Sequence, residues 1–206
     1  MHPARAFHEN DRGELIARVA ARGFAVIAGA MENRPHVGHA PVLLEGARLR
    51  FHLSAANPLA EALAAGGRAV ATILGEDAYV SPDWYGLEGQ VPTWNYVSVE
   101  IEGPARVMSR EETARLLDDL AVRYESPLAP KPPWTREKLD PAKFEAMLSA
   151  IVGFEVAVER LEGVTKLSQN KPAEAIARAA GELERLDDDD ARAIAGRMFR
   201  LLEEGD

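Results

Sequence analysis

Cysteine is absent from the 206-residue chain, which excludes a disulfide framework, thiolate metal sites and a cysteine nucleophile. Long apolar runs are absent as well, because no stretch approaches the roughly 20 residues that a membrane-spanning helix needs. The N-terminal residues lack the basic-then-apolar order of a secretory signal peptide. We therefore expect a cytoplasmic protein with no membrane partner.

Basic residues are scarce. The chain has 24 Lys and Arg against 33 Asp and Glu, a formal net charge of −9 at pH 7. A protein that binds duplex DNA usually presents a basic face that displaces counterions from the phosphates. The longest charge run, residues 187–190, consists instead of aspartates. Direct nucleic-acid binding is therefore disfavoured.

Common signatures of catalysis are also missing, since the chain contains no GxSxG, P-loop or GxGxxG pattern. His36, His39 and His52 suggest a metal site, but strand alternation would point His36 and His39 to opposite faces. No carboxylate stands at ligand spacing, so the pattern favours barrel or surface histidines over a metal site. Asp83 and Glu88 lie on one loop and leave a general acid–base pair open.

Hydrophobic residues make up 47% of the chain, enough for the core of one ordinary domain. Alternating patterns separated by short turns predict about six antiparallel strands, with helices between and after them. The expected strands are residues 24–28, 36–44, 48–53, 69–74, 96–108 and 151–161, and the expected helices begin near residues 11, 57, 109, 141, 172 and 187. Pro41 implies an edge, a bulge or a lapse of pairing in the second strand. The pattern indicates a mainly β (α+β) fold, a small β-barrel with peripheral and C-terminal helices.

Aromatic residues gather in residues 78–96, which hold two of the three tryptophans and three of the four tyrosines. Pro82 ends a strand-like run, Gly86 and Gly89 allow a loop, and a second strand begins after Pro92. Stiff rings on a loop between two strands suit a planar ligand. An aromatic plug over one end of the core is the alternative that the residues leave open.

Two polar segments could bind an anion. Ser54 to Asn57 connects a strand to a helix, with Asn57 as its cap and Pro58 at its first position. Amides at such a junction can face a phosphate, although many capped helices bind none. Residues 166–171, Lys-Leu-Ser-Gln-Asn-Lys, are dense in hydrogen-bond donors, and a solvated helix cap accounts for them equally simply.

Taken together and in this order, five segments resemble the PaiB-like family of FMN-binding proteins. They are residues 39–41 (His-Ala-Pro), 56–58 (Ala-Asn-Pro), 78–85 (Ala-Tyr-Val-Ser-Pro-Asp-Trp-Tyr), 91–96 (Val-Pro-Thr-Trp-Asn-Tyr) and 166–172 (Lys-Leu-Ser-Gln-Asn-Lys-Pro). The resemblance runs from the first expected helix to Pro172. The aromatic motifs and the Lys-Leu-Ser-Gln-Asn motif are specific, whereas His-x-Pro or Asn-Pro alone would be weak.

The resemblance implies an FMN-binding split β-barrel, similar to pyridoxamine-phosphate oxidases. Residues 1–165 would form the flavin-binding barrel, and residues 166–206 would add the polar motif and helices packed on the same domain. It also implies a homodimer with FMN in two clefts at the subunit interface. The family is described as negative transcriptional regulators, and the acidic charge leads us to expect indirect regulation through flavin, a ligand or a partner.

The family's cofactor contacts correspond to eleven residues of this sequence. Ser54 and Asn57, with neighbouring amides, would contact the phosphate. The other nine are His39, Ala40 and Pro41 along the flavin ring, Thr93, Trp94 and Asn95 lining the cleft, and Lys166, Gln169 and Asn170 reaching in from the partner subunit.

Two departures from the family pattern weaken anion binding. Ser54-Ala55 stands where the family tends to have an arginine before Ala-Asn-Pro, and Lys171 replaces an arginine whose bidentate clasp lysine cannot make. Two other functions stay open. One is a flavin-dependent oxidoreductase of unknown substrate. The other is a binder of haem or another planar ligand, with His36, His39 or His52 as the axial ligand.

Overall fold

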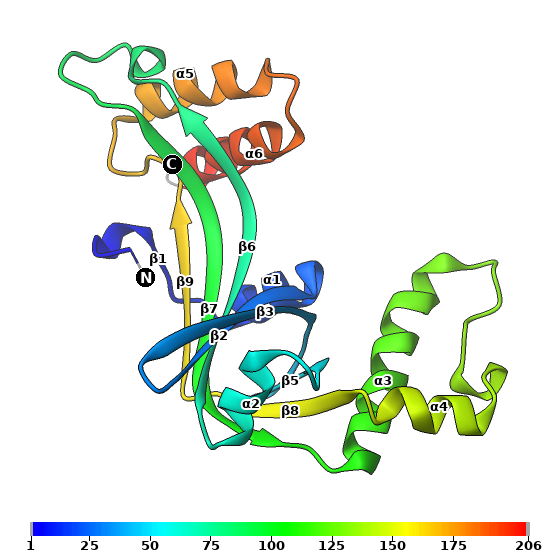
Figure 1. The fold of residues 1–206 in the computed structure, drawn as a ribbon. Helices are drawn as coiled ribbons and strands as arrows, with labels where there is room; N and C mark the ends of the chain where they lie inside the picture. The colour runs from blue at the N-terminus through cyan, green and yellow to red at the C-terminus, as the bar shows by residue number, and fades with distance from the viewer. Residues whose placement is uncertain (1, 205–206) are drawn as a thin grey trace. The chain divides into compact units, whose positions relative to one another are not determined.

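The computed structural model describes residues 2–204 of the chain. They form two compact units, each assembled from segments that lie far apart in the sequence (Figure 1). One, called the helical unit below, comprises Met1–Leu15, Leu74–Val99 and Glu162–Asp206; the other, the barrel unit, comprises Ile16–Ile73 and Glu100–Leu161. The division at residue 165 stays a prediction.

Nine strands form one sheet in the described part of the chain, with neighbours in the order β3-β2-β6-β7-β8-β5-β4 and with β9 pairing β1 and β7. Antiparallel pairing joins β2 to β3 and β6, β5 to β4 and β8, β7 to β8, and β1 to β9. The strands are β1 His8–Glu9, β2 Phe24–Met31, β3 Arg34–Pro41, β4 Leu43–Glu45, β5 Arg48–Ser54, β6 Arg68–Val80, β7 Thr93–Val107, β8 Ile151–Ala157 and β9 Arg160–Lys166. The predicted mainly antiparallel fold is confirmed.

Alternation along β5 builds the core of the barrel unit. Leu49, Phe51 and Leu53 are buried, whereas the residues between them point outward. Phe51 lies opposite Phe154 of β8 in the register, and their rings stack with centroids 5.7 Å apart. Period-two alternation thus gives this strand one apolar face and one polar face.

Two of the predicted strands are each broken by the fold. Residues 36–44 form β3 and β4, because β3 is the edge strand and ends at Pro41, which cannot donate to a ladder. Residues 151–161 form β8 and the start of β9. The amides of Val158 and Glu159 still donate to Ala47 O and Glu102 O, in the registers that pair β8 with β5 and β7, and β9 begins after a bend at Glu159.

Gly103 of β7 lies very close to the end of β8. A Cβ atom on Gly103 would lie 1.8 Å from the carbonyl oxygen of Ala157. Only glycine therefore permits β7 to pass the end of β8 at this distance.

Several helices begin at capping side chains. Asn57 Oδ1 accepts from Leu59 N at 2.9 Å as predicted, and Ser109 and Glu112 form a capping box where a helix start was expected. Asp188 Oδ1 accepts from Ala191 N at 3.0 Å at the start of the last helix. The helices are α1 Arg12–Arg22, α2 Pro58–Ala64, α3 Arg110–Glu125, α4 Pro141–Leu148, α5 Ala173–Glu184 and α6 Asp189–Glu203.

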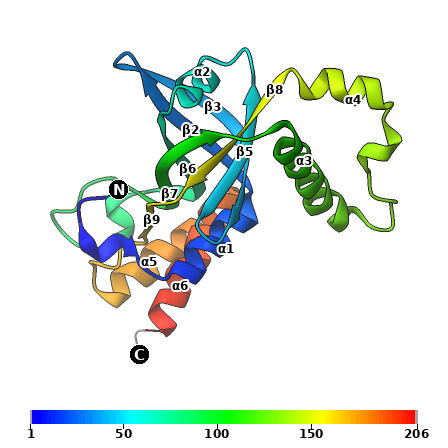
Figure 2. The same ribbon diagram turned by 90° about the horizontal axis from the view of Figure 1, so that it is seen from below.

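Helices α5 and α6 lie side by side in the helical unit, as both ribbon views show (Figures 1 and 2). Ala179 and Leu183 of α5 pack with Ile194 and Met198 of α6, and all four side chains are buried. Tyr85, from a short 3-10 helix at Pro82–Tyr85, belongs to the same cluster. The core of this unit is therefore mainly helical.

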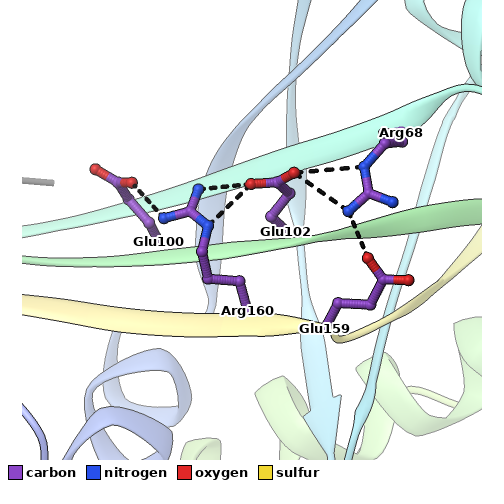
Figure 3. A network of polar contacts seen from close by, with 5 residues as sticks. All are labelled: Arg68, Glu100, Glu102, Glu159 and Arg160. Atoms are coloured by element: carbon purple, nitrogen blue, oxygen red, sulfur yellow. Dashed lines mark hydrogen bonds and ion pairs between the residues drawn. The ribbon is translucent and has the colours of Figure 1, made fainter.

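A network of charges joins three strands of the barrel unit (Figure 3). Arg160 of β9 donates to Glu102 of β7 at 2.9 and 2.7 Å, and it also pairs with Glu100 at 3.3 Å. Arg68 of β6 joins Glu102 at 3.2 Å and Glu159 at 2.6 Å. Hydrogen bonds from Arg160 and then Arg68 lower the pKa of Glu102.

No helix between residues 2 and 204 is both long and apolar enough to cross a membrane. The same stretch has no group of three or more His, Asp or Glu residues arranged to hold a metal ion.

A pH-dependent contribution to stability is predicted at Glu112. Arg106 donates to both of its oxygens at 3.0 and 2.8 Å, and this pairing, with the Ser109 amide, lowers the pKa of Glu112 from 4.5 to about 2. The stabilisation is therefore present above about pH 4.5 and is lost as the pH falls toward 2. Glu112→Gln is expected to lower the free energy of unfolding at pH 7 and to reduce its fall between pH 4.5 and 2.

Urea titrations at several pH values measure this effect. Glu111→Gln is the matched control, because the Glu111 side chain is 82% exposed and pairs with Arg115 on its own helix. An equal response to acid in the wild type and in Glu112→Gln would contradict the prediction.

Candidate functional site

Residues 39–41 form the end of the edge strand of the barrel unit. His39, Ala40 and Pro41 lie opposite Val26, Ala25 and Phe24 of β2. Ala40 is buried in the core and His39 is exposed. The segment therefore presents its backbone and two of its side chains at the surface.

The outward face of β2 and β3 is unusually apolar. Directly opposite residues share a face, so Phe24, Val26 and Val37 lie on the same side as His39 and Pro41. The exposed fractions of Phe24, Val26 and Val37 are 47%, 40% and 53%. Exposed apolar patches are found where proteins contact other molecules. We call it the apolar face.

The turn before α2 uses most of its own amides. Ala55 N donates to Ala150 O, Ala56 N to Ser54 Oγ and Asn57 N to Ser54 O. Asn57 Oδ1 caps the helix, which leaves its amide nitrogen Nδ2 and the Ser54 hydroxyl to meet a ligand. The backbone amides expected at a phosphate are therefore engaged internally, and two side chains remain as donors.

A cavity of about 630 Å³ opens in the barrel unit, with Pro41 and His52 in its wall. His52 and Ser54 are two residues apart in β5, so both lie on its outward face. Burial lowers the pKa of His52, and its Nδ1 is out of contact with solvent and has no hydrogen-bond partner in the described chain. The sequence suggested His52 only as a metal or haem ligand and not as part of a cavity wall. Its position two residues before Ser54 does place both side chains on the same face of β5.

Lys166 organises the second group of predicted residues, in the helical unit. Its Nζ donates to Thr93 Oγ1 at 2.5 Å and to Trp94 O at 2.7 Å, and it lies 5.9 Å from the centroid of the Phe7 ring. Partial burial lowers the pKa of Lys166. Lys166, Thr93 and Trp94 are thus brought together within a single chain.

Asn95 and Gln169 have structural hydrogen bonds. Asn95 is fully buried, and its amide nitrogen donates to Ser168 Oγ at 3.0 Å and to Met198 Sδ at 3.5 Å. Gln169 Oε1 accepts from Leu167 N at 2.7 Å, while its Nε2 donates to Ala6 O and Thr165 O. These two side chains hold the turn at residues 167–170, and Asn170 is exposed at its end.

Part of the aromatic stretch at residues 78–96 is a plug over a core, and another part is exposed and available to a ligand. Tyr85 is buried, and its hydroxyl lies 2.7 Å from Ser168 Oγ, so this part is a plug over the helical core. Tyr79 and Trp94 form an edge-to-face pair with centroids 6.2 Å apart, and they are 43% and 53% exposed. The exposed pair beside Lys166 is the part available to a ligand.

The available groups match the chemistry of a phosphorylated flavin. The barrel unit by itself supplies the apolar face, the Ser54 hydroxyl and the Asn57 Nδ2 donor. The helical unit by itself supplies the exposed rings of Tyr79 and Trp94 and the Lys166 amine. Apolar and aromatic surfaces suit a planar ring system, and the donors suit its polar edge and its phosphate. The family tends to have arginines where this chain has Ser54-Ala55 and Lys171. Lys166 is therefore the cation among the eleven predicted site residues.

Solved structures share this fold. One is the FAD and heme binding protein from Mycobacterium smegmatis, with a TM-score of 0.61, 20% identity, and coverage of 82% of this chain and 78% of that one. Another is the flavocytochrome Anf3 from Azotobacter vinelandii, with a TM-score of 0.63, 19% identity, and coverage of 94% and 78%. The fold is a split β-barrel with peripheral and C-terminal helices.

The family model described as "Putative FMN-binding domain" matches residues 1–160. The chain therefore belongs to this FMN-binding family, and FMN is its cofactor. A curated relative is the protease synthase and sporulation protein PAI 2 of Bacillus subtilis, 29% identical over 175 residues that cover 83% of each chain. The predicted resemblance to the PaiB-like family is confirmed.

Proposed function

We propose that this protein is an FMN-binding homodimer that regulates gene expression indirectly, through its flavin, a ligand or a protein partner. The family match over residues 1–160 carries the flavin part of the proposal. The apolar face supports the dimer, and the distribution of charge supports an indirect mode of regulation.

The flavin ring would lie along residues 39–41, where an exposed strand end adjoins the apolar face. Ser54 and the free amide nitrogen of Asn57 would contact the phosphate, and Thr93, Trp94, Lys166 and Asn170 would supply further polar and aromatic contacts. Asn95 and Gln169 would act by holding Trp94 and the turn at residues 167–170 in place, since their own polar groups are bonded internally.

A second copy of the chain would cover the apolar face. Burial of Phe24, Val26 and Val37 would remove several large apolar side chains from water, each worth roughly 1.5–3 kcal/mol when fully buried. His39 stands opposite Val26 in this face. Closure of the dimer would therefore also bury the predicted ring-binding segment.

Regulation would not require contact with DNA. The PAI 2 relative is named a protease synthase and sporulation protein, and this name supports the regulatory part of the proposal. Here the α5–α6 pair could imitate a helix-turn-helix, but α6 begins with aspartates, and the side chains of Asp187 and Asp189 are almost fully exposed. Phosphates would be repelled there. The oxidoreductase and haem-binding alternatives stay predictions.

FMN titration of matched variants tests the site. Asn57→Asp keeps the oxygen that caps α2 but replaces the free donor with a negative charge, so it is expected to weaken FMN binding at least tenfold without a loss of thermal stability. Lys166→Met removes the amine and keeps the apolar stem, and we expect a similar loss. Flavin fluorescence quenching measures both affinities.

Asn10→Asp and Lys138→Met are the controls, because they make the same charge changes at exposed positions outside the site. Both should bind FMN like the wild type. Wild-type affinity in folded Asn57→Asp and Lys166→Met would overturn the site assignment, and no FMN binding by the wild type would overturn the proposed function.

The dimer is tested by Val26→Glu. A carboxylate in the centre of the apolar face would be desolvated on association, so we expect monomers by light scattering at concentrations where the wild type is dimeric. Val122→Glu introduces the same charge at a 67% exposed position on α3 and should leave the dimer intact. A monomeric wild type, or a dimeric Val26→Glu variant, would contradict this part of the proposal.

A further inference from the structure

The 630 Å³ cavity of the barrel unit has features that FMN binding alone does not explain. Its walls come from α3, from the connector at residues 126–140 and from α4, and its floor includes Pro41 and His52. Its volume falls within the roughly 300–1,000 Å³ that small-molecule sites occupy. Most of the lining is aliphatic or aromatic.

Aromatic side chains select the shape of an occupant. Tyr124, Trp134 and Phe144, from three different segments, all line the cavity. Rings arranged in this way favour flat aromatic molecules, which they contact by stacking or edge-to-face packing. Trp134 and Met147 remain 42% and 57% exposed, so an apolar ligand would cover surface that the chain itself leaves to water.

The cavity wall holds two carboxylates, of Asp118 and Glu125, and two cations, of Arg136 and Lys143, so its charges balance. Arg136 pairs with Asp118 at 3.3 Å, and Glu125 accepts from Trp134 N at 2.8 Å and pairs with Lys131 outside the wall. These groups therefore do not demand a charged ligand.

His52 is the histidine in the cavity wall among the described residues. Its Nδ1 has no partner in the described chain and is closed to solvent, so contact with an occupant falls to Nε2, and burial favours the neutral imidazole. A neutral imidazole carries one donor and one acceptor nitrogen. A hydroxyl group can donate or accept, so it can bond the imidazole in either tautomer.

We propose that this cavity binds a planar aromatic molecule bearing a hydroxyl group, with His52 as its polar contact. Pro41 belongs to both the cavity wall and the predicted ring-binding segment, so the occupant would lie beside the flavin as a substrate or effector. That adjacency rests on the proposed function, whereas binding of the aromatic molecule does not.

Equilibrium dialysis of the full-length protein tests the proposal with 2-naphthol and with 2-methylnaphthalene, which has the same shape but no hydroxyl. We expect saturable binding of 2-naphthol. Ala121→Trp fills the cavity from α3 and should weaken both ligands at least tenfold. Ala146→Trp, on the exposed side of α4, should change both by less than twofold.

His52→Phe separates the polar contact from the apolar cavity. Loss of one hydrogen bond of about 1 kcal/mol corresponds to about fivefold weaker binding of 2-naphthol, with 2-methylnaphthalene unchanged within twofold. Absence of saturable binding, or equal loss in Ala121→Trp and Ala146→Trp, would overturn the cavity assignment. Equal loss of both ligands in His52→Phe would overturn the role of His52.

Saturating FMN distinguishes this site from the flavin site. We expect 2-naphthol affinity to change by less than twofold when FMN is bound. Competitive displacement would show that the cavity is the flavin pocket and would overturn the proposal of a separate site. FMN binding with no binding of 2-naphthol would overturn this inference and leave the proposed function intact.

Discussion

The buried hydroxyl of Ser168 is the junction on which the helical unit depends. Ser168 has a φ of +63° and is 3% exposed, and its Oγ lies within hydrogen-bond distance of the Tyr85 hydroxyl and the Asn95 carboxamide. A larger residue would not fit, and an apolar one would leave two buried polar groups unsatisfied. One side chain thus ties the aromatic loop, the start of β7 and the polar turn together.

This junction explains how the same aromatic stretch can be both core and ligand surface. Tyr85 and Asn95 point into the helical unit, while Trp94, the neighbour of Asn95 in β7, points outward by strand alternation. Lys166 then holds the backbone of Trp94 from β9. In the barrel unit, alternation does the same at residues 39–41, where buried Ala40 anchors exposed His39. Both groups of predicted residues stand on strands whose other face is fixed in a core, which gives the rigid support that a binding site needs.

The sequence was most informative where a feature depends on neighbouring residues. The helix starts near residues 57, 109 and 187 and the end of pairing at Pro41 follow from local chemistry and were predicted correctly. The break after β8 was not predicted, because Val158 continues the alternation of the strand and the bend at Glu159 has no mark in the local sequence.

Side-chain roles that depend on packing were harder to foresee. Nothing in the local pattern showed that the side chains of Asn95 and Gln169 would form hydrogen bonds within the fold, or that Ser168 would adopt a positive φ. The cavity around His52 was also invisible, because it needs α3, the connector and α4 to fold over β5. The resemblance therefore predicted which residues belong to the candidate site. The structure was needed to separate the residues that can contact a ligand from those that support the fold.

Hydrogen–deuterium exchange with and without FMN is the most direct measurement of the central claim, that flavin binding engages both groups of residues. Amides of a bound segment exchange more slowly when the ligand suppresses local opening. The account predicts protection by FMN in peptides that cover residues 39–40, 54–57, 93–95 and 166–170, with little change in α5 and α6. Protection confined to other segments, with these four unchanged, would contradict it.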